Sequence, residues 1–250
     1  QSAALGMQAH AHGSGSVAAG VASKAMQAGT TAIGGWTEAI ADKATALGDL
    51  AKAKNNRATA LGHDSQATGE FSTAAGGSSR ASGIASVATG KNATASGSNA
   101  IATGNAANAT GTGAVATGAE ASASGNAAAY GYKAKATGGW SSAFGNESTA
   151  TATDASAFGN SANAGGVNST AIGSHSTVTA NNGSALGNYA SVSAEGGVAL
   201  GKGSSSSRTA LNADNVHISD AGTITSSTGI SDNDIKNNKN HDVYAPVKLI

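Results

Sequence analysis

The sequence predicts an all-β chain whose main part is a parallel β-roll, a solenoid of about fifteen coils with 14 residues in each coil. Three observations predict this fold: a composition dominated by small residues, a glycine that returns at a fixed interval, and an alternation of small and larger side chains around that glycine. The predicted ranges are 1–203 for the roll, 204–230 for a linker with a short hairpin-like cap, and 231–250 for a polar tail.

Large apolar residues are scarce in this chain of 250 residues, because Leu, Ile, Val and Phe together number 32. Such a chain either stays unfolded or repeats so regularly that small side chains stack. Basic and acidic residues balance at 14 each, which argues against a nucleic-acid partner, since Lys and Arg must neutralise phosphates. The absence of cysteine excludes disulfide frameworks, zinc ribbons and thiol catalysis. No apolar run approaches the roughly 18 residues of a membrane span, so we expect no membrane insertion.

A glycine recurs every 14 residues, with a single 13-residue step between Gly118 and Gly131, and the residue two positions before it is always Ala. These repeat glycines are Gly6, Gly20, Gly34, Gly48, Gly62, Gly76, Gly90, Gly104, Gly118, Gly131, Gly145, Gly159, Gly173, Gly187 and Gly201. A unit of this length is too short for a helical hairpin and suits two short strands with turns.

Side chains alternate between the two faces of a strand, so each position in the repeat has a predicted face. The third and fifth residues after the glycine are small, as are the residues two and four before the next one. These rows are predicted to face each other, because only Ala, Ser and Gly let two sheets approach well below the usual ~10 Å. The fourth and sixth residues are polar and are expected to face water; examples are Lys52 and Lys54, Thr94 and Ser96, Asn108 and Thr110, Ser122 and Ser124, and Thr177 and Thr179.

The outer face of the other strand carries the apolar bulk, about one large side chain in each coil. Most precede the glycine directly, and where that position holds Thr the residue two earlier is Val or Ile. The row consists of Leu5, Ile33, Leu47, Leu61, Val87, Ile101, Val115, Tyr130, Phe144, Phe158, Ile172, Leu186 and Leu200. A rod with such a stripe exposes more apolar surface than a monomer normally tolerates. We therefore predict an obligate oligomer joined along this row.

At these residues the chain resembles a known family. Ser184-Ala185-Leu186-Gly187 and Val198-Ala199-Leu200-Gly201 are similar to the head repeats of trimeric autotransporter adhesins. The resemblance covers residues 1–203 and implies a left-handed parallel β-roll that assembles as a homotrimer on a bacterial surface. The same roll occurs in phage fibres, and the neck and coiled-coil stalk of the adhesins do not follow the repeats here.

Beyond the roll, two short strands are predicted, over residues 216–218 and 222–224. The tail then contains Ser231-Asp232-Asn233-Asp234-Ile235-Lys236-Asn237-Asn238, which resembles the start of the self-cleaving chaperone at the end of phage tail fibres. That family cleaves just before the Ser with a Ser–Lys pair, so the resemblance implies that Ser231 is the nucleophile and Lys236 its base. The alternative is a solvated polar tail.

Other chemistry-bearing residues carry weaker signals. His10 and His12 lie on the polar face without a third ligand, so we expect exposed polar residues and no metal or cofactor. Trp36 and Trp140 fall outside the small-residue rows, and packing at a turn or chain interface is favoured over receptor binding. No catalytic constellation stands out, so the only enzymatic activity expected is self-cleavage at Ser231.

Three functions remain open at this point. The favoured interpretation is a trimeric phage tail fibre that attaches to a protein or glycan of the host surface, because of Ser231 and Lys236. The alternative is the head of a bacterial surface adhesin. A more distant one is an ice-binding solenoid, which thermal hysteresis would test, although Thr89, Thr103 and Thr117 fall in the apolar stripe.

Overall fold

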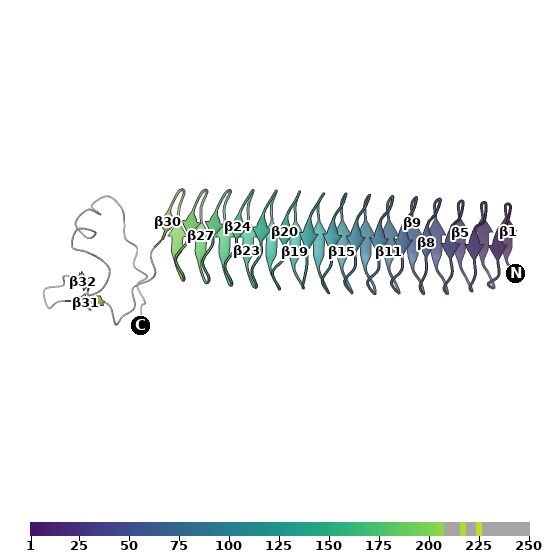
Figure 1. The fold of residues 1–250 in the computed structure, drawn as a ribbon, viewed down its shortest axis with the longest axis horizontal. Coiled ribbons are helices and arrows are strands. Elements are labelled where there is room, and N and C mark those ends of the chain that lie inside the picture. Colours follow the sequence, from purple (N-terminus) through teal and green to yellow (C-terminus); the bar gives the residue numbers. More distant parts are fainter. Residues whose placement is uncertain (208–215, 219–223, 227–250) are drawn as a thin grey trace.

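The computed structural model describes residues 1–207, 216–218 and 224–226, and residues 1–207 form one stack of coils with no helix (Figure 1). Each coil contains one strand of three residues and one of two residues. The strands form two parallel sheets of fifteen strands each. The predicted all-β parallel roll of about fifteen coils is therefore confirmed.

The odd-numbered strands of the roll form sheet A, and the even-numbered strands form sheet B. Sheet A consists of β1 (Ala3–Leu5), β3 (Val17–Ala19), β5 (Thr31–Ile33), β7 (Thr45–Leu47), β9 (Thr59–Leu61), β11 (Thr73–Ala75), β13 (Val87–Thr89), β15 (Ile101–Thr103), β17 (Val115–Thr117), β19 (Ala128–Tyr130), β21 (Ser142–Phe144), β23 (Ser156–Phe158), β25 (Thr170–Ile172), β27 (Ser184–Leu186) and β29 (Val198–Leu200). Sheet B consists of β2 (His10–Ala11), β4 (Lys24–Ala25), β6 (Glu38–Ala39), β8 (Lys52–Ala53), β10 (Gln66–Ala67), β12 (Arg80–Ala81), β14 (Thr94–Ala95), β16 (Asn108–Ala109), β18 (Ser122–Ala123), β20 (Lys135–Ala136), β22 (Thr149–Ala150), β24 (Asn163–Ala164), β26 (Thr177–Val178), β28 (Ser191–Val192) and β30 (Ser205–Ser206).

Every strand pairs in register with the equivalent strand of the next coil. Ala46 in β7, for example, lies opposite Ala60 in β9. The register advances by 13 residues only between β17 and β19, where Ala116 lies opposite Ala129. The turn at Gly125 and Asn126 is one residue shorter than the equivalent turns, so both sheets keep their strand register.

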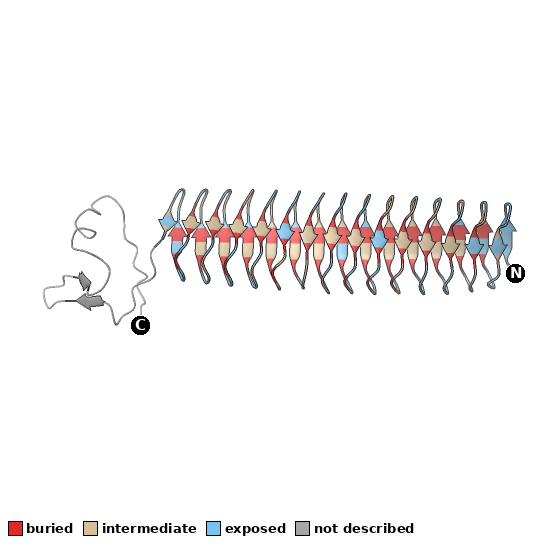
Figure 2. Ribbon diagram, in the orientation of Figure 1, coloured by how far each residue is buried: buried red, intermediate tan, exposed pale blue. Residues whose placement is uncertain are grey.

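The space between the sheets is filled by small side chains. In the coil that begins at Gly48, Ala51, Ala53, Ala58 and Ala60 have no exposed surface. Figure 2 shows this buried layer through the stack apart from its end strands, with exposed to intermediate turns along both edges. The predicted inward rows are thus confirmed.

Buried hydroxyl groups replace some of these Ala side chains and are mostly satisfied locally. Ser65 Oγ donates a hydrogen bond of 2.8 Å to the carbonyl of Gly62, and Ser79 Oγ donates one of 2.9 Å to that of Gly76. Because the acceptor is the turn carbonyl three residues earlier, the hydroxyl avoids the cost of an unpaired buried donor. Ser16 and Ser169 are exceptions, with no partner for Oγ.

The repeat glycine is required where sheet A ends. Gly6 has a φ of 129°, and a Cβ added there would lie 2.6 Å from the carbonyl oxygen of Gly20 in the next coil. A positive φ occurs at all fifteen repeat glycines. Only a residue without Cβ combines this backbone conformation with so close an approach, which explains the constant spacing.

Residues beyond the roll form one small antiparallel pair among those described, β31 (Val216–Ile218) and β32 (Ile224–Ser226). The first strand has the predicted bounds. The second shares only Ile224 with the predicted segment, because its pairing extends towards Ser226, which lies opposite Val216.

We predict that Ala102→Leu destabilises the roll far more than Thr94→Lys. Ala102 is fully buried between the sheets, and overpacking costs about 1–3 kcal/mol or more. Thr94 faces outward from sheet B, where a substitution changes stability by about 0.5 kcal/mol or less. Thermal unfolding of the two variants measures the difference, and equal melting temperatures would show that the two faces are assigned the wrong way round.

A second prediction concerns the two largest side chains of the interior, Val178 and Val192, which face Gly183. A Cβ at Gly183 would lie 2.7 Å from Val178 Cγ1 and 2.9 Å from Val192 Cγ1. Gly183→Ala alone should therefore cost about 1–3 kcal/mol. That cost should be clearly smaller in the Val178→Ala background, because the shorter side chain frees the space.

A double-mutant cycle on the free energy of unfolding tests this coupling. Ala116→Gly, which shortens a fully buried residue in a distant coil, is the matched background. If the losses in unfolding free energy from Val178→Ala and Gly183→Ala simply add in the double variant, the two residues do not compensate for each other's volume, and the prediction is wrong.

Candidate functional site

The outer face of sheet A carries one continuous row of apolar side chains. This apolar row has the thirteen members predicted above: Leu5, Ile33, Leu47, Leu61, Val87, Ile101, Val115, Tyr130, Phe144, Phe158, Ile172, Leu186 and Leu200. None of them is buried. The exposed fraction is 44% at Ile33, 37% at Leu186 and 73% at Leu200. The structure thus places every predicted member on one surface that the described chain leaves uncovered.

Two outward positions of each sheet A strand share this face, and their sizes compensate. In β15 the side chains are Ile101 and Thr103, whereas in β21 they are Ser142 and Phe144. β11, with Thr73 and Ala75, is a coil without a large side chain. From β13 to β27 each strand of sheet A presents one large outward side chain, as a close-packed contact with another surface requires. The threonines considered for ice binding lie on this same face, between Val and Ile side chains.

Three aromatic rings stack along the apolar row in consecutive coils. Tyr130 and Phe144 have centroids 4.7 Å apart and an interplanar angle of 13°, and Phe144 and Phe158 are 5.1 Å apart at 9°. The neighbouring outward residues, Ala128 and Ser142 among them, are small. The stack begins directly after the 13-residue coil, and the in-register pairing of β19, β21 and β23 holds the rings parallel.

The outer face of sheet B is mostly polar and cationic, although Met26 and Ile40 are apolar residues on it. Its outward positions include Lys24, Lys52, Lys54 and Arg80, and Glu38 is the acidic residue among the described ones there. Lys24 Nζ lies 3.3 Å from Glu38 Oε1. The equal numbers of basic and acidic residues gave no indication of this cationic face. Sorting the charged residues by their position in the repeat would have predicted it.

The turns display large side chains on strained backbone. Trp36 and Trp140 both have a positive φ, and their exposed fractions are 58% and 64%. They lie on opposite edges of the roll, since Trp36 follows a sheet A strand and Trp140 follows a sheet B strand. More than half of each side chain is exposed, so the described chain does not bury either Trp. A role for them in a chain interface stays a prediction.

Other groups at the turns form isolated pairs. The rings of His175 and Tyr189 stack with centroids 4.8 Å apart. Tyr132 raises the pKa of Lys133 by accepting a hydrogen bond from its ammonium group, and the carboxylate of Glu120 adds to the effect. These exposed pairs bring no third reactive group together.

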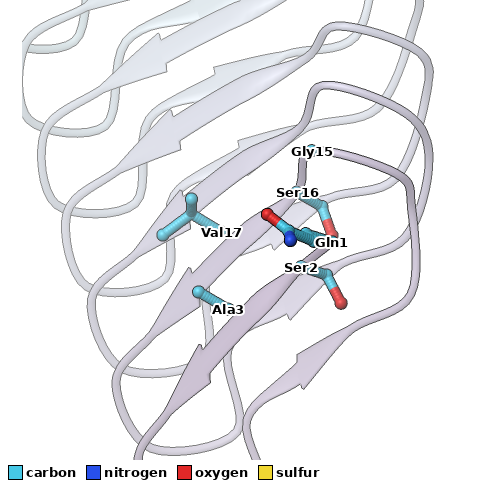
Figure 3. A pocket seen from close by; sticks show the side chains of 6 residues that line it. All are labelled: Gln1, Ser2, Ala3, Gly15, Ser16 and Val17. Carbon is cyan, nitrogen blue, oxygen red and sulfur yellow. The ribbon is translucent and has the colours of Figure 1, made fainter.

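A shallow depression lies at the N-terminal end of sheet A, where the first coil has a neighbour on one side only (Figure 3). Its lining consists of Gln1, Ser2, Ala3, Gly15, Ser16 and Val17. It holds no ionisable side chain other than the chain terminus. The geometry therefore suggests the end of a stack rather than a binding pocket.

Residues 1–207 and the two short strands contain no cluster of three or more metal-ligating side chains. The rings of His10 and His12 are 5.8 Å apart and tilted by 47°. None of the described residues forms a helix that is long and apolar enough to cross a membrane. Ser231 and Lys236 lie outside the described residues, so their predicted role remains untested.

The repeats match the protein family described as "YadA head domain repeat (2 copies)". Ten overlapping segments match: 27–51, 39–65, 53–79, 67–93, 81–107, 95–121, 136–162, 150–176, 164–190 and 179–204. Together they cover more than half of the chain. The interruption between 121 and 136 includes the shortened turn of the 13-residue coil, at Gly125 and Asn126.

Among solved structures, the chain is similar to the crystal structure of the collagen-binding domain of the Yersinia adhesin YadA. The two sequences are 25% identical over 63% of this chain and 84% of that chain, with a TM-score of 0.34. No protein of curated function matches the chain. On its repeat pattern, its fold and the ten matched segments, this chain belongs to the family of YadA head repeats, the non-enzymatic adhesin domains displayed outside the cell.

Proposed function

We propose that this chain is the head of a bacterial surface adhesin that works as a parallel homotrimer and attaches to the host surface or its matrix. The observation that carries the proposal is the uncovered apolar row on sheet A. The row runs from β1 to β29 over the two outward positions of the sheet A strands, so a second and third copy in the same register meet it layer by layer.

Energetics supports an obligate assembly. Full burial of a Leu, Ile or Phe side chain contributes about 1.5–3 kcal/mol. Roughly half of that remains to be gained at positions such as Leu47 and Phe144, which are already half-buried. Over the row, burial against other copies contributes on the order of 10 kcal/mol per chain, enough to favour association strongly. Membership in the YadA head family favours three copies.

Attachment is then left to the surfaces that the assembly keeps exposed. Sheet B and the turns remain outside when sheet A is covered, and they carry the polar, cationic and exposed aromatic side chains. The ligand class that we propose is a protein or glycan of the host surface.

The trimer is tested by Leu47→Asp combined with Leu186→Asp. Three carboxylates would be buried in each of two layers, and an unpaired buried charge costs several kcal/mol. The matched control, Thr94→Asp with Ser191→Asp, adds the same charge to the outward face of sheet B. We expect a stable trimer from wild type and control in mass measurement, and monomer or aggregate from the Leu47/Leu186 variant.

Binding of the same three proteins to cultured host cells and to immobilised matrix proteins, collagen included, tests the adhesin function. Wild type should bind, and the Leu47/Leu186 variant should lose most of its binding because it loses the assembly. The control, whose substitutions lie on sheet B, reports whether that face takes part in attachment. A trimer of the Leu47/Leu186 variant would refute the apolar row as the interface, and a wild-type trimer without any host ligand would refute the adhesin function.

The phage tail fibre, which the sequence favoured, depends on Ser231 and Lys236. The family match supports the adhesin head instead, since it rests on the repeats themselves. Self-cleavage therefore stays a prediction with its own test.

If a longer form of this protein carries a chaperone domain after Ile250, its expression should yield a fragment that ends at Ile230. Ser231→Ala and Lys236→Ala should each block this cleavage, because one removes the nucleophile and the other its base. Ser227→Ala is the matched control and should be cleaved like wild type. Identical uncleaved masses for all four proteins would leave residues 231–250 as a polar tail and remove the main reason for the phage function.

A further inference from the structure

We propose that the outer face of sheet B binds a linear sulfated polysaccharide that lies parallel to the stack of coils. The proposal rests on the proposed function in one respect, namely that sheet A is covered by other copies and sheet B faces outward. It goes beyond that function by naming the surface and the chemistry of the ligand.

The charges of the roll are sorted by surface. The cationic face, as we call it, consists of the outward residues Lys24, Lys52, Lys54, Arg80 and Lys135 on sheet B, with Glu38 as the acidic residue among the described ones there. The other described acidic residues all lie in turns: Asp42, Asp49, Asp64, Glu70, Glu120, Glu147, Asp154 and Glu195. The described outward positions of sheet A carry no charge. A chain with no net charge thus presents one flat face with a positive potential.

The cations are available and regularly spaced. Lys52, Lys54 and Arg80 form no ion pair with any described residue, whereas Lys24 pairs with Glu38. Lys24, Lys52 and Arg80 occupy the same position of the repeat in alternate coils, through β4, β8 and β12. Neighbouring strands are about 4.8 Å apart, so these cations recur at about 9–10 Å along a straight line. A chain-like anion with charges at a regular interval matches such a line better than a compact anion does.

The side chains between the cations favour a sulfated sugar chain. Amide and hydroxyl groups lie between the cations. Gln66 is in β10, Thr68 follows β10, and Ser82 follows β12. These groups exchange hydrogen bonds with sugar hydroxyls and with sulfate oxygens. Arg80 is suited to bind a sulfate with two parallel hydrogen bonds. Together the charges and the neutral polar groups match both components of a sulfated polysaccharide.

Nucleic acid fits this face less well. Single strands bind where aromatic side chains stack on the bases, and the described outward positions of sheet B hold no aromatic ring apart from His10 and His12. Sequence reading of a duplex requires a helix or ribbon that enters a groove, whereas the cationic face is a sheet of two-residue strands.

The test uses heparin as the probe and a pair of charge-matched variants of the full chain. The face variant combines Lys52→Gln, Lys54→Gln and Arg80→Gln. The control combines Lys43→Gln, Lys91→Gln and Lys202→Gln, which removes three exposed cations from turns. We expect the face variant to bind heparin about tenfold or more weakly than wild type, with a shallower dependence on salt, and the control to change by about twofold or less.

Two further probes separate sulfate recognition from charge alone. Desulfated heparin should bind wild type much more weakly, and duplex DNA at equal phosphate concentration should compete poorly. Equal losses in the face variant and the control, unchanged binding after desulfation, or full competition by DNA would each overturn the proposal.

Failure of this proposal is distinguishable from failure of the proposed function. The substituted residues lie on sheet B, so the face variant should keep the mass of the wild-type assembly. A normal assembly without heparin binding would overturn only the polysaccharide site. A single roll that binds heparin without assembling would overturn only the trimer.

Discussion

The rest of the structure depends on how closely two parallel sheets approach each other across Ala methyl groups. Ala51 and Ala53 from sheet B meet Ala58 and Ala60 from sheet A within one coil, and all four are fully buried. The space between the sheets accommodates few side chains larger than Ala. Where Val178 occupies it, the facing residue is Gly183, which has no side chain. Each coil must therefore be short and repeat faithfully, because one large inward side chain would push apart every coil stacked on it.

Because the interior accepts only small residues, the described charged and aromatic side chains lie on the outer faces of the sheets and in the turns. The in-register pairing then places each outward position in a straight row, so a residue type at one position becomes a stripe. Sheet A carries the apolar stripe, and sheet B carries a face with more cations than acids. The turns carry most of the described acids, further cations and the exposed Trp residues. In the proposed assembly, the interface and the binding face lie on opposite sheets of one thin roll.

Most of this arrangement was predictable, since the glycine period and the Ala before it determine which position faces which way. The turn conformation was not, because residues as different as Trp36, Lys43 and Asn92 adopt the same positive φ there. Coil-to-coil hydrogen bonds such as Trp36 N to the carbonyl of Val21, 2.8 Å, impose that backbone whatever the side chain. The cationic face was missed because net charge averages over surfaces that the fold keeps apart.

A rod of identical coils favours ligands that repeat as well. Each coil adds the same rise of about 4.8 Å, so a linear polymer with a matching period would stay aligned with Lys24, Lys52 and Arg80 across the five coils from β4 to β12. Each extra contact then forms within a complex that already exists, which raises the overall affinity without any single strong site. A compact ligand contacts only a few coils and gains nothing from the length of the roll.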